Sequence, residues 1–303
     1  MDSAKLIDDN SLIHTAGLPA QDLPDACLYI VGLPIGNLGD ITLRALWVLN
    51  HVDIVAAEDT RQSRKVLEKF NISVPLCSVH QHNEHEGAEE LLGYLREGKR
   101  VALVTDAGTP AVSDPGSKVV KTVRDNGFRV IPIPGCSAVV TAMSAAGMAP
   151  EGFIFHGFLE GGKVERSRMI AELASTGRTF VLYEAPHRIC KLAQEIAETL
   201  EDERRVVVAR ELTKKFETLE SMQSTELAAW AKAHRPLGEY VVIVNAKEEK
   251  CESNLDGATQ AWISKLAEHL PTGLLASVAS EISGTPKKQI YDTILAIKQD
   301  RAE

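Results

Sequence analysis

The sequence predicts an α/β protein: two α/β domains with a ligand cleft between them, followed by a small C-terminal helical domain. Short apolar runs alternate with helical patterns along most of the chain, which is typical of βαβ units. Nearly every such run ends in a polar or Gly/Pro-rich cluster, and ligands bind at this end of the strands in open α/β sheets. The segment 133–152 is rich in proline and glycine, as expected at a domain boundary.

Residues 101–116 show this pattern most fully. The apolar run Val101–Val104 is typical of a buried strand, and it breaks into a turn that contains Asp106, Gly108 and Pro110. Asp40 is the expected N-cap of the helix that follows the first strand. Four more strands are expected in this half of the chain, at 28–31, 52–57, 76–79 and 128–133. Because helices separate these strands, we expect a mainly parallel sheet whose polar loops converge on one side.

The expected organisation has four parts. These are a flexible N-terminal tail over 1–25, an N-terminal α/β domain over 26–133, a second α/β domain over 134–246 and a helical domain over 257–303. Residues 247–256 are polar and charged, and we interpret them as a linker. In the helical part, Thr272 is the expected cap of one helix, while Thr285 and Pro286 are the expected N-cap and first residue of another after Gly284. This pattern resembles a helix-turn-helix, although a small bundle without a nucleic-acid role fits the sequence equally well.

Composition excludes several classes. The chain has 303 residues, 44% of them hydrophobic, enough for a large core. Its net charge of -9 argues against a generally basic nucleic-acid coat, but allows a local basic patch. The five cysteines are scattered without a CxxC pair, which indicates a reducing, cytoplasmic setting. Residues 1–25 have no signal-peptide pattern, and the uncharged segment 130–150 is interpreted as a buried turn and helix, so no membrane partner is expected.

Common ligand motifs are absent from the sequence. Gly32, Gly36 and Gly39 have the spacing GxxxGxxG rather than GxGxxG, and no Walker, HExxH or GxSxG pattern occurs. His80 and His82, with Glu84, are one conceivable metal site. Hydrogen bonding is the favoured interpretation of these side chains, and no metal is expected.

Seven short motifs occur in one order along the chain. They are Leu33–Arg44, Ala57–Arg61, His82–Glu84, Asp106–Pro110 with Ser113–Gly116, Pro134–Ala138, Tyr183–Arg188 and Arg210–Lys214. Together they closely resemble the ribosomal RNA small-subunit methyltransferase I family, within the tetrapyrrole-methylase-like superfamily of class III methyltransferases. The resemblance covers about 27–246, and the helical tail resembles the C-terminal domain of that family.

The resemblance implies an activity and its partners. It implies S-adenosylmethionine as methyl donor, and the ribose 2′-hydroxyl of cytidine 1402 in 16S ribosomal RNA of the small ribosomal subunit as acceptor. It also implies a homodimer in the cytoplasm. The residues that it places in the donor pocket are Leu33, Pro34, Asp106, Thr109, Ser137, Ala138, Tyr183 and Leu212.

The chemistry of these donor residues fits in part. Asp106 offers an acceptor, Ser137 lies at an expected helix start, and Tyr183 and Leu212 offer apolar surface to an adenine. Ordinary core packing is the alternative for Leu33, Ala138 and Leu212. Replacing Asp106 with alanine is expected to abolish donor binding in a folded protein.

The acceptor side needs a group that binds or orients a poorly nucleophilic hydroxyl. Candidates at the ends of adjacent strands are Glu58, Asp59, Arg61, His82, Asn83 and Glu84. We expect Asp59 or Glu84 to accept a proton and Arg61 to hold a phosphate. A structural network of ion pairs among these residues fits the sequence equally well.

RNA binding would require local positive charge. Basic positions with this potential are Arg61, Arg64, Lys65, Lys163, Arg166, Arg168, Arg188, Lys214, Lys215, Lys287 and Lys288. The segment 160–163 is less basic than the family usually shows, which weakens the expectation of RNA contact there. Two rival functions stay open: methylation of a tetrapyrrole or another small molecule, and RNA binding without catalysis.

Overall fold

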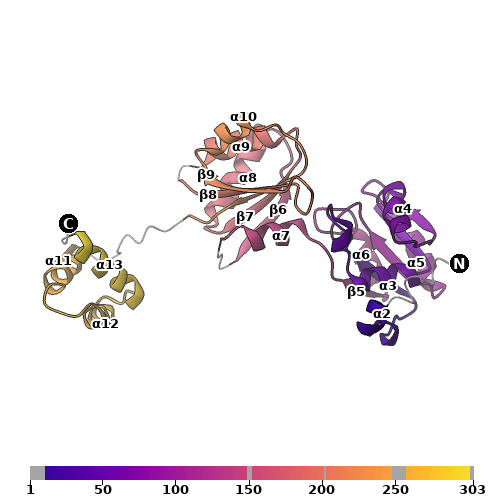
Figure 1. Cartoon of the computed structure of the whole chain (residues 1–303), viewed down its shortest axis with the longest axis horizontal. Helices are drawn as coiled ribbons and strands as arrows, with labels where there is room; N and C mark the ends of the chain where they lie inside the picture. The colour runs from indigo at the N-terminus through magenta and orange to yellow at the C-terminus, as the bar shows by residue number, and fades with distance from the viewer. Residues whose placement is uncertain (1–10, 149–151, 201–202, 248–256, 301–303) are drawn as a thin grey trace. The chain divides into compact units, whose positions relative to one another are not determined.

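The computed structural model describes residues 11–148, 152–200, 203–247 and 257–300. The chain divides into two compact units, Met1–Lys247 and Glu248–Glu303. Two separate β-sheets lie in the first unit, whereas the described part of the second unit is helical (Figure 1). Residues 1–10 of the expected tail and 248–256 of the expected linker lie outside the described residues.

The first sheet has five strands, all parallel, in the order β3-β2-β4-β1-β5. Its strands are β1 (Cys27–Val31), β2 (Ile54–Ala57), β3 (Leu76–Ser78), β4 (Val101–Val104) and β5 (Arg129–Ile133). Its helices are α3 (Leu43–His51), α4 (Thr60–Lys69), α5 (Glu84–Arg96) and α6 (Ser117–Asp125). The strand–helix alternation that the sequence predicts is therefore confirmed.

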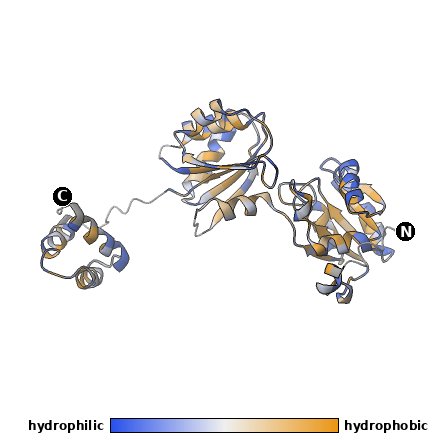
Figure 2. Cartoon of the chain, viewed as in Figure 1, coloured by the Kyte–Doolittle hydropathy of each residue, from blue (hydrophilic) through white to orange (hydrophobic). Residues whose placement is uncertain are grey.

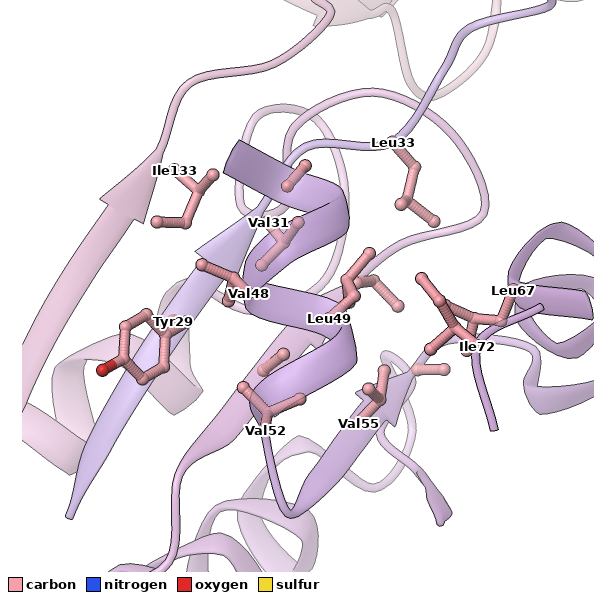
Figure 3. Packing of buried hydrophobic residues seen from close by; sticks show 14 of the residues in the cluster. Tyr29, Val31, Leu33, Val48, Leu49, Val52, Val55, Leu67, Ile72 and Ile133 are labelled. Atoms are coloured by element: carbon pink, nitrogen blue, oxygen red, sulfur yellow. The ribbon is translucent and has the colours of Figure 1, made fainter. Parts of the chain in front are cut away.

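Helices cover both faces of this sheet, so its central strands are buried on both sides. Side chains of α3 and α4 pack on one face, where Tyr29, Val31 and Leu49 belong to a single apolar cluster (Figure 3). Side chains of α5 and α6 pack on the other face against Leu28 and Leu103. Strands with two buried faces need continuous apolar runs, and the strands are accordingly hydrophobic along their length (Figure 2).

The second sheet is mixed, with the order β6-β7-β10-β8-β9. Only β6 and β7 pair in parallel; the other neighbours are antiparallel. The strands are β6 (Phe153–Phe158), β7 (Thr179–Glu184), β8 (Arg205–Arg210), β9 (Thr218–Gln223) and β10 (Tyr240–Val244). Helices α8 (Lys163–Ser175), α9 (Ile189–Thr199) and α10 (Leu227–Ala233) pack on one face, and α7 (Ala138–Ala145) packs on the other (Figure 1).

Two local expectations are wrong. The N-cap of α3 is Thr42, whose hydroxyl accepts the Ala45 N–H at 3.0 Å, whereas Asp40 ends a short 3-10 turn, η2 (Leu38–Asp40). Part of the expected flexible tail is folded, as α2 (Ser11–Thr15) and the 3-10 turn η1 (Leu18–Ala20). Ile13 and Leu18 lie in the core of the first sheet, and their burial orders this stretch.

The second unit consists of α11 (Gly257–Leu266), α12 (Thr272–Ser283) and α13 (Lys287–Asp300) in its described part. The three helices share a core that contains Ile263, Leu275 and Ile290. Gly284 ends α12 in the left-handed conformation, at φ 71°, as the sequence predicts for a helix stop. Within the described residues, no helix has both the length and the apolar character that a membrane crossing requires.

Candidate functional site

The loops that follow β1, β4 and β5 are joined to one another. Leu33 and Gly108 exchange two backbone hydrogen bonds, of 2.8 and 3.0 Å, across the loops after β1 and β4. The loops after β1 and β5 approach each other closely at Gly32 and Gly135, where a Cβ on Gly135 would lie 2.8 Å from the Cα of Gly32. Only glycine permits this approach. The three loops therefore form one continuous surface at the carboxyl ends of the strands.

A cavity of about 320 Å³ lies between this surface and the second sheet. The second sheet contributes Phe158 at the end of β6, Tyr183 in β7, and Tyr240 in β10. Leu212 also lines the cavity and lies between Glu211 and Thr213, which both have positive φ, at 51° and 65°. The volume suits a small organic ligand, and the walls come from both α/β halves of the first unit.

Five of the predicted donor-binding residues line this cavity. They are Thr109, Ser137, Ala138, Tyr183 and Leu212. The Thr109 hydroxyl donates to the Cys136 carbonyl at 3.0 Å, which ties the loop after β4 to the start of α7. Ser137 is the N-cap residue of α7, so backbone N–H groups of the first helical turn lie beside it. Donor binding by these residues stays a prediction.

Three other predicted donor residues do not line the cavity. Leu33 is 1% exposed and packs in the core of the first sheet, and Pro34 is also buried. Asp106 is exposed, and its carboxylate accepts the backbone N–H of Asp59 at 3.2 Å. Leu33 and Asp106 therefore shape the loops around the cavity, and Leu33 does so through its backbone bonds to Gly108.

Tyr183 is held firmly in the cavity wall. Its hydroxyl oxygen accepts the Val139 N–H at 3.0 Å, and its ring meets the rings of Phe155 and Phe158 edge-on at 4.8 and 5.7 Å. Burial raises the pKa of the Tyr183 hydroxyl to about 12, so the side chain is neutral near pH 7. It offers a fixed, uncharged aromatic surface.

Asp59 and Arg61 form an exposed ion pair at the start of α4. Asp59 accepts the Arg61 backbone N–H at 2.8 Å as helix N-cap, and also accepts two side-chain hydrogen bonds of 2.9 and 3.1 Å from Arg61. Hydrogen bonding from Arg61 lowers the pKa of the Asp59 carboxyl to about 2. A carboxylate of such low proton affinity is a weak base near pH 7. Neither residue lines the cavity, and their catalytic roles stay predictions.

Glu84 is buried, with 6% of its surface exposed. Its carboxylate accepts the backbone N–H of Gly116 at 2.7 Å, and Lys118 lies 3.3 Å away. These contacts tie α5 to the loop between β4 and α6. The expected proton acceptor therefore holds a loop in place, and its participation in proton transfer stays a prediction.

The histidines beside Glu84 belong to a turn. Asn83 accepts the His80 backbone N–H at 2.7 Å and donates to the Ser78 carbonyl at 3.0 Å. The rings of His80 and His82 are 6.0 Å apart, centroid to centroid. Among the residues that the structure describes, no three His, Cys, Asp or Glu side chains gather in a way that could hold a metal ion.

Three of the basic residues proposed for RNA contact are engaged inside the protein, and one of them, Arg188, pairs with the buried Glu184 at 3.0 Å. Arg166 is 5% exposed and bonds to Glu195 at 2.7 Å and Glu184 at 3.0 Å, which removes it from the RNA candidates. Lys214 forms ion pairs of 2.8 and 2.7 Å with Glu211 and Glu239. Isolated sequence positions do not distinguish such paired cations from free surface cations.

Sequence reasoning missed Asp114 and Glu184 as cavity residues. Asp114 lies in the Ser-Asp-Pro-Gly turn after β4, and its place in this motif could have indicated that it belongs to the site. Burial, together with the charges of Glu58 and Asp106, raises the pKa of the Asp114 carboxyl to about 7. An acid of this pKa inside a cavity is a candidate for proton transfer.

Comparison with known proteins identifies the family. The family model described as Tetrapyrrole (Corrin/Porphyrin) Methylases matches residues 27–228. Ribosomal RNA small subunit methyltransferase I of Vibrio cholerae serotype O1 is 44% identical over 266 residues, which are 87% of this chain and 92% of that protein. These matches confirm the resemblance that the ordered motifs predict.

Solved structures share the fold. Diphthine synthase has a TM-score of 0.58 at 18% identity, over 73% of this chain and 90% of that chain. Uroporphyrin-III C-methyltransferase from Thermus thermophilus, complexed with S-adenyl homocysteine, has a TM-score of 0.52 at 22% identity, over 71% of this chain and 96% of that chain. The chain therefore belongs to the tetrapyrrole methylases and, among these enzymes, to the ribosomal RNA small subunit methyltransferase I family.

Proposed function

We propose that this protein transfers a methyl group from S-adenosylmethionine to the ribose 2′-hydroxyl of a cytidine in 16S ribosomal RNA, at position 1402 in the customary RNA numbering. The observation that carries the proposal is the cavity, because five predicted donor residues from four separate segments of the chain line it. Membership of the ribosomal RNA methyltransferase family supports the choice of acceptor.

The cavity suits the donor chemically. Tyr183 and Leu212 offer aromatic and aliphatic surface to an adenine, and both line the cavity. Thr109 and the N-terminal turn of α7 bring backbone groups that read the polar ends of such a molecule. S-adenyl homocysteine is the demethylated product of this donor, and its presence in one protein of the same fold supports the proposal.

The acceptor requires positive charge outside the cavity. Arg61 has a side chain that is 86% exposed, and Lys163 has one that is 64% exposed. Lys287 and Lys288 are exposed at the first turn of α13 in the helical unit. Lysine and arginine bind RNA phosphates without base specificity, and salt weakens such binding. We place the reaction in the cytoplasm, on a homodimer, with the small ribosomal subunit as partner.

The test is methyl transfer in vitro. Purified protein and methyl-labelled S-adenosylmethionine are incubated with small ribosomal subunits from cells that lack this enzyme. Mass spectrometry of nuclease fragments should then show one added methyl group on the ribose of cytidine 1402. Subunits that already carry this methyl group are the matched control, and they should accept none.

Parallel incubations separate the rival functions. Methylation of uroporphyrinogen or a precorrin, without methylation of RNA, would support the rival function in which the protein methylates a tetrapyrrole. Calorimetry with S-adenosylmethionine tests the other rival, since a non-catalytic RNA-binding protein would bind RNA but no donor.

A further inference from the structure

We propose that Asp114 is the catalytic residue that takes the proton from the acceptor hydroxyl as the methyl group is transferred. This inference rests on the proposed methyltransferase function and adds a named base to it. Asp114 is half-buried and lines the cavity, close in sequence to Val112, which also lines it. Val112 and Phe158 are exposed, at 39% and 45%, so the cavity is open to solvent on this side.

The other acids of the cavity already have cationic partners. Glu184 is fully buried, and its two oxygens contact Arg166 and Arg188, each at 3.0 Å. Glu239 is paired with Lys214 at 2.7 Å. Both carboxylates are therefore already engaged in ion pairs. Among the described residues that line the cavity, Asp114 is the carboxylate without a cationic partner.

The two cavity tyrosines are unsuitable as bases. Tyr183 has a pKa raised to about 12 by burial, and its oxygen already accepts the Val139 N–H. Tyr240 is 3% exposed, and burial also raises its pKa. Both phenols therefore keep their protons near neutral pH and cannot receive another.

The loop that carries Asp114 has an unusual backbone. Ala111 and Ser113 have positive φ angles of 67° and 63°, which are uncommon for residues with a side chain. They alternate with Val112 and Asp114, the two residues of this loop segment that reach the cavity. Backbone of this kind is strained and tends to occur where a site fixes a side chain.

Three contacts fix this strained loop. The buried carboxylate of Glu84 accepts the Gly116 N–H at 2.7 Å, and the Ala111 N–H donates to the Pro115 carbonyl at 3.2 Å. Ser113 lies against Gly157 at the β-bulge of β6, where a Cβ would lie 2.2 Å from the Ser113 Oγ. Glu84 is thus a positioning residue for Asp114, which is a different role from the proton acceptor that the sequence predicts.

The charges around Asp114 set its proton affinity. Glu58 faces it from the end of β2 and Asp106 from the end of β4, and both charges add to burial in raising the pKa of Asp114 to about 7. On the β7 side the neighbouring titratable group is Tyr183, which is neutral. A base with a pKa near the working pH is ionised in a large fraction of molecules and still accepts a proton readily.

The step balances. The Asp114 carboxylate takes the hydroxyl proton while the hydroxyl oxygen bonds to the methyl carbon. The bond from that carbon to the sulfonium sulfur breaks, and sulfur keeps the electron pair as a neutral thioether. Asp114 then returns the proton to water. No oxidant, reductant or metal takes part in this step.

The test compares Asp114→Asn with the wild type on small ribosomal subunits. Asparagine has almost the same shape and cannot take the proton, so kcat should fall by about 10²–10⁴-fold, the usual contribution of a general base. The donor Kd from calorimetry should change by less than about threefold, because binding is expected to need little from this carboxylate. Asp125→Asn, an exposed aspartate on α6, is the matched control and should change neither quantity.

The pH profile gives a second readout that needs no variant. The kcat of the wild type should fall below about pH 7 as Asp114 becomes protonated. A flat wild-type profile from pH 5 to 8 would overturn the assignment, as would full kcat or loss of donor binding in Asp114→Asn. A wild type that methylates no RNA would overturn the proposed function and this assignment together, whereas an active wild type with an equally active variant would overturn only the assignment.

Discussion

Arg166 shows how one residue determines the stability of the second domain. Its guanidinium holds Glu184 of β7 and Glu195 of α9, and all three side chains are buried. Arg166→Met keeps most of the side-chain volume but leaves two buried carboxylates with less compensating charge. We expect the free energy of unfolding in urea to fall by about 3–5 kcal/mol.

A neighbouring arginine supplies the control for this prediction. Arg168 lies on the same helix, is 72% exposed, and pairs with Glu172 at 3.6 Å. Arg168→Met should lower the free energy of unfolding by less than about 1 kcal/mol, as for other exposed pairs. Equal losses in the two variants would show that burial of the Arg166 network contributes nothing.

Asp106 carries a prediction about the donor. Its carboxylate accepts the Asp59 N–H at 3.2 Å, and residues 107–109, which follow it, line the cavity. Asp106→Ala should abolish the calorimetric signal of S-adenosylmethionine binding. The variant removes the hydrogen bond that anchors the loop and the negative charge close to the site. Circular dichroism should show unchanged folding. Near-normal affinity would remove Asp106 from donor binding.

The site residues that the sequence predicts and those that it misses differ in kind. Ser137 and Tyr183 belong to short local motifs that the family resemblance assigns to the donor pocket, and both line the cavity. The unpaired state of Asp114 and the burial of Arg166 depend on side chains far apart in sequence, such as Glu195. No local pattern reports such contacts, and charge pairing decides whether an acid or a cation is free to act.

At the scale of elements, the loop after β4 and strand β6 approach each other closely at a glycine. Gly157 has φ 84°, and a Cβ there would lie 2.2 Å from the Ser113 Oγ but 3.4 Å from its Cβ. Gly157→Ala should therefore lower both the melting temperature and kcat, because the Asp114 loop must shift. Adding Ser113→Ala to this variant should restore much of the loss, since the closest clash disappears.

Gly177 separates backbone strain from the clash. Its φ is 68°, and a Cβ there would meet nothing within 4 Å. Gly177→Ala should cost about 1 kcal/mol of unfolding free energy from the positive φ alone, and should leave kcat unchanged. If Gly157→Ala behaves in the same way as Gly177→Ala, the contact with Ser113 has no role in the site.

Elements were predictable where their pattern is long or repeated. The strands β1 to β5 and the helices between them follow from continuous apolar runs and turns. Folding of residues 11–20 was not predictable, because the stretch has no long apolar run, and Ile13 and Leu18 gain stability only from the core they join. The cap of α3 was misplaced by two residues because Asp40 and Thr42 are both good N-cap types, and only tertiary structure selects one.

At the scale of the whole molecule, the two units have separate cores. Every residue that lines the cavity belongs to Met1–Lys247, and the helical unit has its own apolar cluster around Ile263, Leu275 and Ile290. Donor binding should therefore need only the first unit. RNA binding should involve both units, because Lys287 and Lys288 add exposed positive charge in the second unit.

Truncation after Lys247 tests this division of labour. The shortened chain should bind S-adenosylmethionine with an affinity within about twofold of the full chain, because additive behaviour is expected of separate units. Its kcat/KM on small ribosomal subunits should fall by more than about tenfold and become less sensitive to salt, because phosphate contacts are lost. The full chain with Lys287→Ala and Lys288→Ala is the matched variant; it should show part of the same loss with unchanged donor binding. If truncation leaves kcat/KM and its salt dependence unchanged, the helical unit does not bind this RNA, and the exposed cations of the first unit are sufficient.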